Sequence, residues 1–343
     1  MTPAIFGIAG PALTNDERAF FRDADPVGYI LFQRNCVNRP QLRALTDELR
    51  ALHGRDRLLI SIDQEGGRVA RMKPPEWPAY PSGERFAALY QAAPLSAVEA
   101  VRVNAEAMGH ELAACGLTVN FHAPLDVRRS ETVDAIGDRA LGHDPLQVAA
   151  LGRAMIEGFA RAGIAGCLKH MPGHGRAMLD THKALPTVTA TADDLEADIA
   201  PFRQLAASTP IGMSAHIIYT AWDAERPATL SHRVINSVIR GEIGFDGLLL
   251  TDDIDMKALS GSIHDRSAEA IAAGCDVVLN CWARMPDMQH IAETLPPLSV
   301  AGHKRLADAL ADRTLSDDAD RRGKAEELLV KRDALFVAAG LAT

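Results

Sequence analysis

The chain has 343 residues, of which 47% are hydrophobic, so it can fill a sizeable core and is not a disordered polypeptide. Its 36 basic and 45 acidic side chains leave a formal charge of −9, which disfavours nucleic acid or an anionic membrane as a partner. The sequence shows no signal-peptide pattern and no apolar run of about 18 residues, so we expect no membrane span. Five scattered cysteines are typical of reduced, buried thiols, and we expect a cytoplasmic protein that binds a neutral or small polar ligand.

Eight short apolar runs rich in valine, isoleucine and leucine recur along the chain. They lie at residues 4–9, 28–32, 58–63, 117–126, 166–170, 211–216, 247–252 and 275–280. Nearly continuous apolarity is typical of strands that are buried on both faces, as in a parallel sheet. Helical patterns separate the runs; Val101, Ala105, Met108 and Leu112, for example, share one helical face before Gly116. These alternations predict a single (β/α)₈ TIM barrel, an α/β fold, over residues 1–343.

The lengths of the connecting segments indicate which end of the barrel carries the site. The links that enter strands, such as 54–57 and 163–165, are short, whereas the segments that leave strands at 64–95, 127–145, 171–192 and 217–230 are long. Long loops gathered on one face are where a barrel enzyme keeps its active site. Helical patterns at 304–311 and 324–338 predict the last barrel helix and an extra C-terminal helix on the outside.

The segment from Lys169 to His182 holds the densest group of reactive side chains. It contains three histidines, a lysine and an aspartate, and its proline and two glycines exclude a regular helix. Asp180 and His182 are two residues apart, so the carboxylate could orient the imidazole and tune its proton affinity. We interpret this segment as a catalytic loop at the end of a strand.

Polar residues also close the other predicted strands. In chain order these strand-end residues are Asp63, Asp126, Lys169, His170, His216, Asp252, Asp253 and Asn280. In a barrel they converge on one mouth, which is rich in carboxylates and imidazoles and poor in metal-ligand spacing. A retaining glycosidase needs a carboxylate nucleophile and a proton donor, but the pattern does not choose between Asp252 and Asp253.

The segment after the third predicted strand allows two interpretations. Asp63 and Arg71 could hold sugar hydroxyls through charge-assisted hydrogen bonds. Alternatively, an ion pair between Asp63 and Arg71, or between Glu65 and Arg68, could shape the loop.

Four segments together resemble a known family. Lys169-His170-Met171-Pro172-Gly173-His174-Gly175, followed after four residues by Asp180-Thr181-His182, resembles the signature of the β-N-acetylglucosaminidases of glycoside hydrolase family 3. Further matches are residues 63–69, 136–139 and 251–253, in the same order. The resemblance implies a single barrel without a second domain. It also implies a cytoplasmic bacterial enzyme that removes terminal β-linked GlcNAc from muropeptide-derived sugars, the GlcNAc-1,6-anhydro-MurNAc peptides of cell-wall recycling.

The resemblance also implies roles for individual residues. Asp252 would be the nucleophile that forms a covalent glycosyl intermediate, His182 the general acid/base and Asp180 its partner. The sugar would be held by Asp63, Arg71, Arg139, Lys169 and His170. We accordingly expect a monomer with a saccharide substrate, no cofactor and no metal. Met171 and the pair Ile254-Asp255 depart from the family pattern, which leaves the leaving-group preference open.

Three other functions compete with this one. A glycosidase of the same family could prefer another sugar or pass the glycosyl group to phosphate. A metal-dependent barrel hydrolase could use His170, His174, Asp180 and His182, although Pro172 prevents the helical histidine pair that zinc sites often use. A sugar-binding barrel without catalysis would bind the same ligands without turnover.

Overall fold

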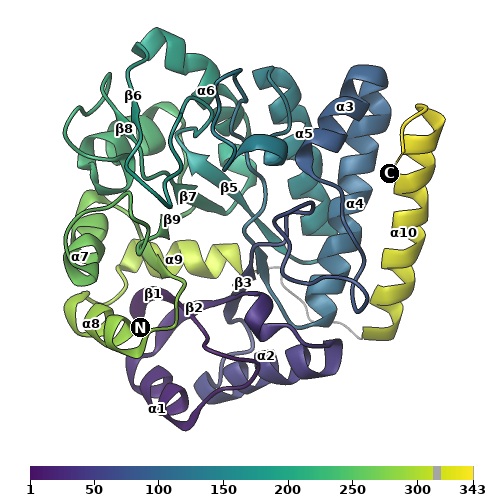
Figure 1. Cartoon of the computed structure of the whole chain (residues 1–343). Helices are drawn as coiled ribbons and strands as arrows, with labels where there is room; N and C mark the ends of the chain where they lie inside the picture. The colour runs from purple at the N-terminus through teal and green to yellow at the C-terminus, as the bar shows by residue number, and fades with distance from the viewer. Residues whose placement is uncertain (312–317, 343) are drawn as a thin grey trace.

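The strands of the computed structural model, which describes residues 1–311 and 318–342, close into a ring (Figure 1). Every neighbouring pair is parallel, and β10 returns to β1 with Ile5 opposite Leu279. The ring consists of β1 (Thr2–Gly7), β2 (Pro26–Leu31), β3 (Leu59–Ile62), β4 (Val119–Asn120), β5 (Ala165–Met171), β7 (Ile211–Ser214), β9 (Leu248–Asp253) and β10 (Val277–Asn280). The predicted eight-stranded barrel is therefore confirmed.

A ring of helices surrounds the strands (Figure 1). It consists of α1 (Asn15–Ala24), α2 (Arg39–His53), α4 (Pro94–Ala114), α5 (Pro145–Arg161), α6 (Ala192–Leu205), the π-helix η5 (Val234–Glu242), α7 (Ile263–Ala273) and α8 (Met285–Thr294). Local sequence sets their ends: Thr14 and Glu17 form a capping box at the start of α1, and Gly54 ends α2 with a φ of 60°. None of the described helices is both long enough and apolar enough to cross a bilayer.

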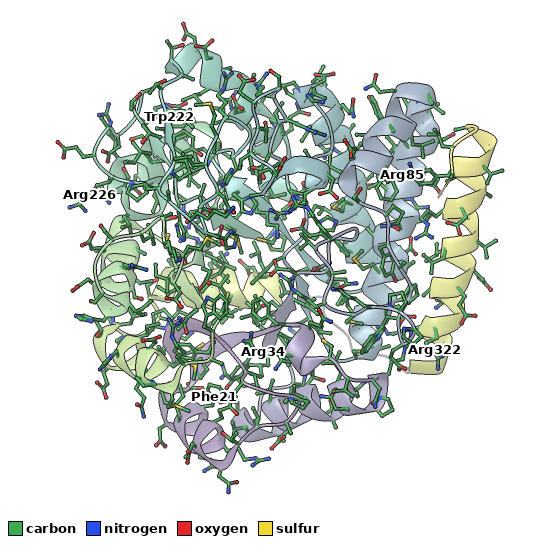
Figure 2. All side chains as sticks on the ribbon, viewed as in Figure 1. Phe21, Arg34, Arg85, Trp222, Arg226 and Arg322 are labelled. Atoms are coloured by element: carbon green, nitrogen blue, oxygen red, sulfur yellow. The ribbon has the colours of Figure 1, made fainter. Side chains whose placement is uncertain are left out.

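Alternate residues of each strand belong to two different apolar layers. Ile5 and Leu59 point into the barrel interior with Phe121 and Met213, whereas Phe6 and Tyr29 pack under the helices. Phe21 of α1, labelled in Figure 2, meets Tyr29 edge-on at 4.9 Å between ring centroids. Because both faces of each strand are buried, the strands read as continuous apolar runs in the sequence.

The prediction for the last barrel helix was wrong. The helical pattern at 304–311 belongs to α9 (Val300–Ala309), which lies in the middle of the helix ring in Figure 1, and α8 takes the expected place. Leu306 and Leu310 join the apolar layer inside the barrel. Arg305 pairs with Asp246 at 2.7 Å and Asp276 at 2.9 Å, which precede β9 and β10, so α9 seals the end of the barrel where the strands begin.

The predicted outer helix is confirmed. In α10 (Asp318–Ala338), which lies beside α4 in Figure 1, Arg332 donates to Asn104 of α4 at 3.0 Å.

Three segments differ from the sequence prediction in detail. The run 117–126 pairs regularly only over β4, because the His122 N–H turns back to the Asn120 carbonyl oxygen at 2.7 Å. Pairing with β5 resumes in a bridge between Pro124 and Lys169, where Leu125 donates to the Lys169 carbonyl oxygen at 2.8 Å. The segment 64–95, for which the sequence analysis names no helix, contains α3 (Gly83–Ala92). The long loops after β5 and β7 pair as a small sheet of β6 (Thr187–Val188) and β8 (Ile218–Tyr219).

Candidate active site

A cavity of about 340 Å³ opens at the carboxyl ends of the barrel strands. All eight side chains to which the family resemblance assigns a role line it: Asp63, Arg71, Arg139, Lys169, His170, Asp180, His182 and Asp252. They come from the ends of β3, β5 and β9 and from the loops that follow β3, β4 and β5. The cavity thus lies where the polar residues at the strand ends predicted it, because parallel strands in a barrel bring their carboxyl ends to one face.

A buried ion network forms one wall of the cavity. Lys169, 2% exposed, places its Nζ 2.6 Å from Glu65 Oε1 and 3.2 Å from Asp63 Oδ1. Burial lowers the pKa of Lys169, but Glu65 and Asp63 raise it by more than burial lowers it. The pKa therefore lies above its ordinary value, and the ammonium stays charged. Arg139 donates two hydrogen bonds to Glu65, at 2.7 and 2.8 Å. Burial raises the pKa of Glu65, but Arg139 and Lys169 together hold it well below its ordinary value.

Glu65 and Arg68, one of the two ion pairs that the second interpretation allowed, do not pair with each other. Glu65 turns inward to Arg139, while Arg68 turns outward to Asp138 at 2.6 Å, so two crossed pairs join the loop after β3 to residues 136–139. Arg71 does approach Asp63, at 3.4 Å, as one of the two interpretations expected. The sequence indicates only a loop-shaping role for Glu65, because nothing near it in the chain points to a partner 74 residues away.

Asp126 fixes the imidazole of His170 from below the cavity. Its Oδ2 lies 2.8 Å from His170 Nδ1, and its Oδ1 accepts the backbone N–H groups of His170 at 3.2 Å and His174 at 2.7 Å. Burial raises the pKa of Asp126, but the charge and hydrogen bonds of His170 lower it more. His174 packs edge-on against His170, and burial together with the charge of His170 lowers the pKa of His174 to about 4.

Asp252 and Asp253 are adjacent but electrostatically different. Burial raises the pKa of Asp252, but the imidazoles of His170 and His216 outweigh it, so the pKa lies below its ordinary value. Burial and the charge of Asp252 raise the pKa of Asp253 to about 7. The Asp253 carboxylate accepts backbone N–H groups of Asp255 at 3.3 Å and Cys281 at 3.2 Å. Asp252 is thus the better candidate for an ionised nucleophile near neutral pH.

His182 and Asp180 form a hydrogen-bonded pair that also lines the cavity. His182 Nδ1 lies 2.8 Å from Asp180 Oδ1, which also accepts the backbone N–H of His182 at 2.9 Å. Partial burial raises the pKa of Asp180, but these hydrogen bonds lower it more. The His182 side chain is 65% exposed, so the pair lies at the opening of the cavity.

Three strand-end residues do not line the cavity, contrary to the expectation that all would converge there. Asp126 supports His170 from behind, and Asn280 is buried. His216 lies 2.8 Å from Thr229 Oγ1 and 3.0 Å from the Asp253 carbonyl oxygen. A buried strand end can point a side chain inward or away from the mouth, and sequence periodicity does not distinguish the two when both faces are apolar.

The three histidines of the metal-site alternative do not come together. His170 associates with His174 and Asp126, whereas His182 associates with Asp180. Across residues 1–311 and 318–342, no group of three or more histidine, cysteine or acidic side chains is arranged to hold a metal ion.

Several lining residues carry no sequence prediction: Phe32, Arg34, Met256 and Trp282. Arg34, labelled in Figure 2, donates to the Cys281 carbonyl oxygen at 2.6 Å, and its guanidinium lies 4.7 Å from the Phe32 ring centroid. Phe32 and Trp282 follow β2 and β10 almost directly, so a strand-end rule extended to aromatic residues would have found them.

A parallel barrel that brings a carboxylate with a lowered pKa and an imidazole–carboxylate pair to one polar cavity supplies the nucleophile and the proton donor that a glycoside hydrolase needs. Residues 10–313 match the glycosyl hydrolase family 3 N terminal domain. The chain is 39% identical over 316 residues to a beta-hexosaminidase of Bordetella avium, covering 90% of this chain and 89% of the relative. A beta-hexosaminidase of Chromobacterium violaceum is 36% identical over 346 residues, with 97% and 96% covered. The chain therefore belongs to glycosyl hydrolase family 3.

Solved structures agree with this assignment. NagZ from Neisseria gonorrhoeae, solved in complex with N-trifluoroacetyl-D-glucosamine, superposes with a TM-score of 0.88 at 30% identity. The superposition covers 100% of this chain and 98% of that one. Within its family, the protein is a β-N-acetylhexosaminidase that hydrolyses terminal β-linked N-acetylglucosamine.

Proposed function

We propose that this enzyme acts on muropeptide-derived sugars, releasing GlcNAc from GlcNAc-1,6-anhydro-MurNAc peptides with retention of configuration. The observation that carries the proposal is that Asp252, with its lowered pKa, and the His182–Asp180 pair line the same cavity. We further propose that the protein acts as a cytoplasmic monomer in cell-wall recycling, as the family resemblance implies.

In the first step, a carboxylate oxygen of Asp252 attacks the anomeric carbon of the terminal sugar. The bond between that carbon and the leaving oxygen breaks, and His182 donates a proton to this oxygen. Because Asp180 engages Nδ1, Nε2 is the nitrogen available to the leaving group. The products of this step are the free aglycone and a glycosyl ester on Asp252.

In the second step, a water molecule attacks the same anomeric carbon. His182, now neutral, accepts a proton from the water, and the ester bond to Asp252 breaks. Two displacements at one carbon restore the β configuration in the released GlcNAc.

We assign the binding of the terminal sugar to the charged residues on the inner walls of the cavity. These are Asp63, Arg71, Arg139, Lys169 and His170, and their ion pairs hold the donors and acceptors in fixed directions. A site with its hydrogen-bonding groups already oriented needs little rearrangement when a polyhydroxylated ring binds.

The proposal is tested with 4-nitrophenyl N-acetyl-β-glucosaminide and with muropeptides analysed by mass spectrometry. Asp252→Ala should lower kcat by about 10³-fold or more, because the variant lacks the carboxylate that forms the glycosyl ester. Asp246→Asn, on a 91% exposed aspartate at the opposite end of the barrel, is the matched control and should keep full activity. Proton NMR of the first product should show the β anomer.

Three outcomes would contradict parts of the proposal. Full activity of Asp252→Ala would refute the nucleophile assignment, and an initial α anomer would refute retention. Release of GlcNAc 1-phosphate in phosphate buffer would show a phosphorylase, and preference for a glucoside over the N-acetylglucosaminide would show another sugar specificity.

A further inference from the structure

Trp282 is a large aromatic side chain that is exposed although it lines the cavity. Its exposed fraction is 59%, and it shares the cavity with Asp252 and His182. Leaving an indole in water forgoes the free energy of burying its apolar area, so an exposed tryptophan at the edge of a ligand site indicates a binding surface.

The backbone that carries Trp282 is held on both sides. The preceding residue, Cys281, donates its N–H to Asp253 and accepts a hydrogen bond from Arg34 at 2.6 Å. Two residues further on, Arg284 pairs with Asp255 on the loop after β9. A side chain presented by a fixed backbone loses less conformational entropy on binding than one on a mobile loop.

The depth of the lining residues gives the cavity an inner and an outer end. Lys169 and Met213 are each 2% exposed and lie at the inner end, above the barrel interior that α9 seals. His182 and Trp282 lie at the opening. An enzyme that removes a terminal sugar takes that sugar inward, so the group on the other side of the broken bond faces outward.

We propose that Trp282 binds the leaving group, with its indole face against the apolar C–H face of the sugar ring attached to the departing GlcNAc. This assignment rests on the proposed function, because it places the terminal sugar at the inner end. A pyranose in the ordinary chair, with mainly equatorial substituents, presents axial C–H groups to a flat surface, and in a 1,6-anhydro ring, which its bridge holds in the inverted chair, the C–H groups of the bridge do so. An indole supplies a broad, rigid surface for both. Trp282 is thus a specificity-determining residue for substrates whose leaving group is a second sugar.

The test compares two substrates that differ only in the leaving group. N-acetyl-β-D-glucosaminyl fluoride releases a single atom, whereas the β-1,4-linked disaccharide of N-acetylglucosamine releases a sugar. In Trp282→Ala, the ratio of kcat/KM for the disaccharide to kcat/KM for the fluoride should fall about tenfold, equivalent to about 1.4 kcal/mol. Trp282→Phe keeps a smaller aromatic face and should show a smaller fall. Leu95→Ala, at an 87% exposed apolar residue on α4, should keep the wild-type ratio.

The remaining outcomes overturn the proposal in distinguishable ways. An unchanged ratio in Trp282→Ala would show that the indole does not contact the leaving group. Equal losses on both substrates, with an unchanged melting temperature, would place Trp282 against the terminal sugar. Turnover of neither substrate by the wild-type enzyme would refute the proposed function and this assignment with it.

Discussion

Glu65→Gln tests the role of the buried ion network in holding the cavity wall. The substitution keeps the size of the side chain but removes the charge between Lys169 and Arg139. Lys169 keeps Asp63 as a neighbour at 3.2 Å, whereas Arg139 loses its carboxylate partner. Removing one partner of a buried ion pair costs about 3–5 kcal/mol, because a buried charge is left uncompensated. We therefore expect a loss of this size in the free energy of unfolding.

The crossed pair between the same two segments supplies a matched control. Arg68 and Asp138 are 47% and 33% exposed, and an exposed pair contributes about 0–1 kcal/mol. Asp138→Asn should therefore cost less than 1 kcal/mol. Urea unfolding, followed by the fluorescence of the three tryptophans, measures both variants. Equal losses in the two variants would refute the reasoning.

Glu65→Gln should also change the pH dependence of stability and lower the activity. The folded pKa of Glu65 lies well below its ordinary value, so its contribution to stability is complete above the unfolded pKa and decreases as the pH falls through the folded pKa. The gap in stability between wild type and Glu65→Gln should consequently be widest near neutral pH and narrow in acid. Displacement of Lys169 and Arg139 should lower kcat/KM by about 10²-fold, since small misplacements of binding groups have large effects.

Three further substitutions have defined outcomes. His182→Ala should slow release of a sugar by about 10²–10⁴-fold and of 4-nitrophenol far less, because the better leaving group does not need a donated proton; equal losses in kcat/KM would contradict the acid assignment. Asp126→Asn removes the charge-assisted bond to His170 and should cost about 1.5–3 kcal/mol in urea unfolding, and wild-type stability would contradict this. Asp253 has a folded pKa of about 7, above its unfolded value, so its contribution to the stability of the wild type should fall as the pH rises towards 7. Asp253→Asn should remove this fall, and identical pH slopes of stability in the two proteins would refute it.

Much of the fold was readable from the sequence because burial on both faces leaves a simple pattern. Each strand needs apolar residues for the interior and for the helix layer, so β2 and β9 appear as continuous runs. The helix α9 was misplaced because an amphipathic pattern shows that one face is buried but not against what. Its Leu306 packs on the barrel floor, where a helix of the outer ring would show the same periodicity.

The features of the site likewise divide into those that the sequence predicts and those that it does not. Side chains near strand ends or in dense motifs, such as Asp252 and His182, were found because chain position alone predicts where they lie. The pairing of Glu65 with Arg139 and the support of His170 by Asp126 were not predicted, because charge complementarity does not identify partners between distant segments. The difference between Asp252 and Asp253 likewise depends on three-dimensional neighbours, which adjacent positions in a sequence do not reveal.

The helix that seals the barrel floor has a consequence for the order of events in catalysis. Since α9 fills the lower end with Leu306, Ala309 and Leu310, the described part of the chain leaves ligands no passage through the barrel axis. Substrate and both products must then pass through the same opening at the carboxyl ends of the strands. The aglycone, which lies nearer that opening, has to leave before the more deeply bound GlcNAc can follow. We therefore expect an ordered mechanism in which the aglycone is released first and GlcNAc last, so that free GlcNAc competes directly with incoming substrate.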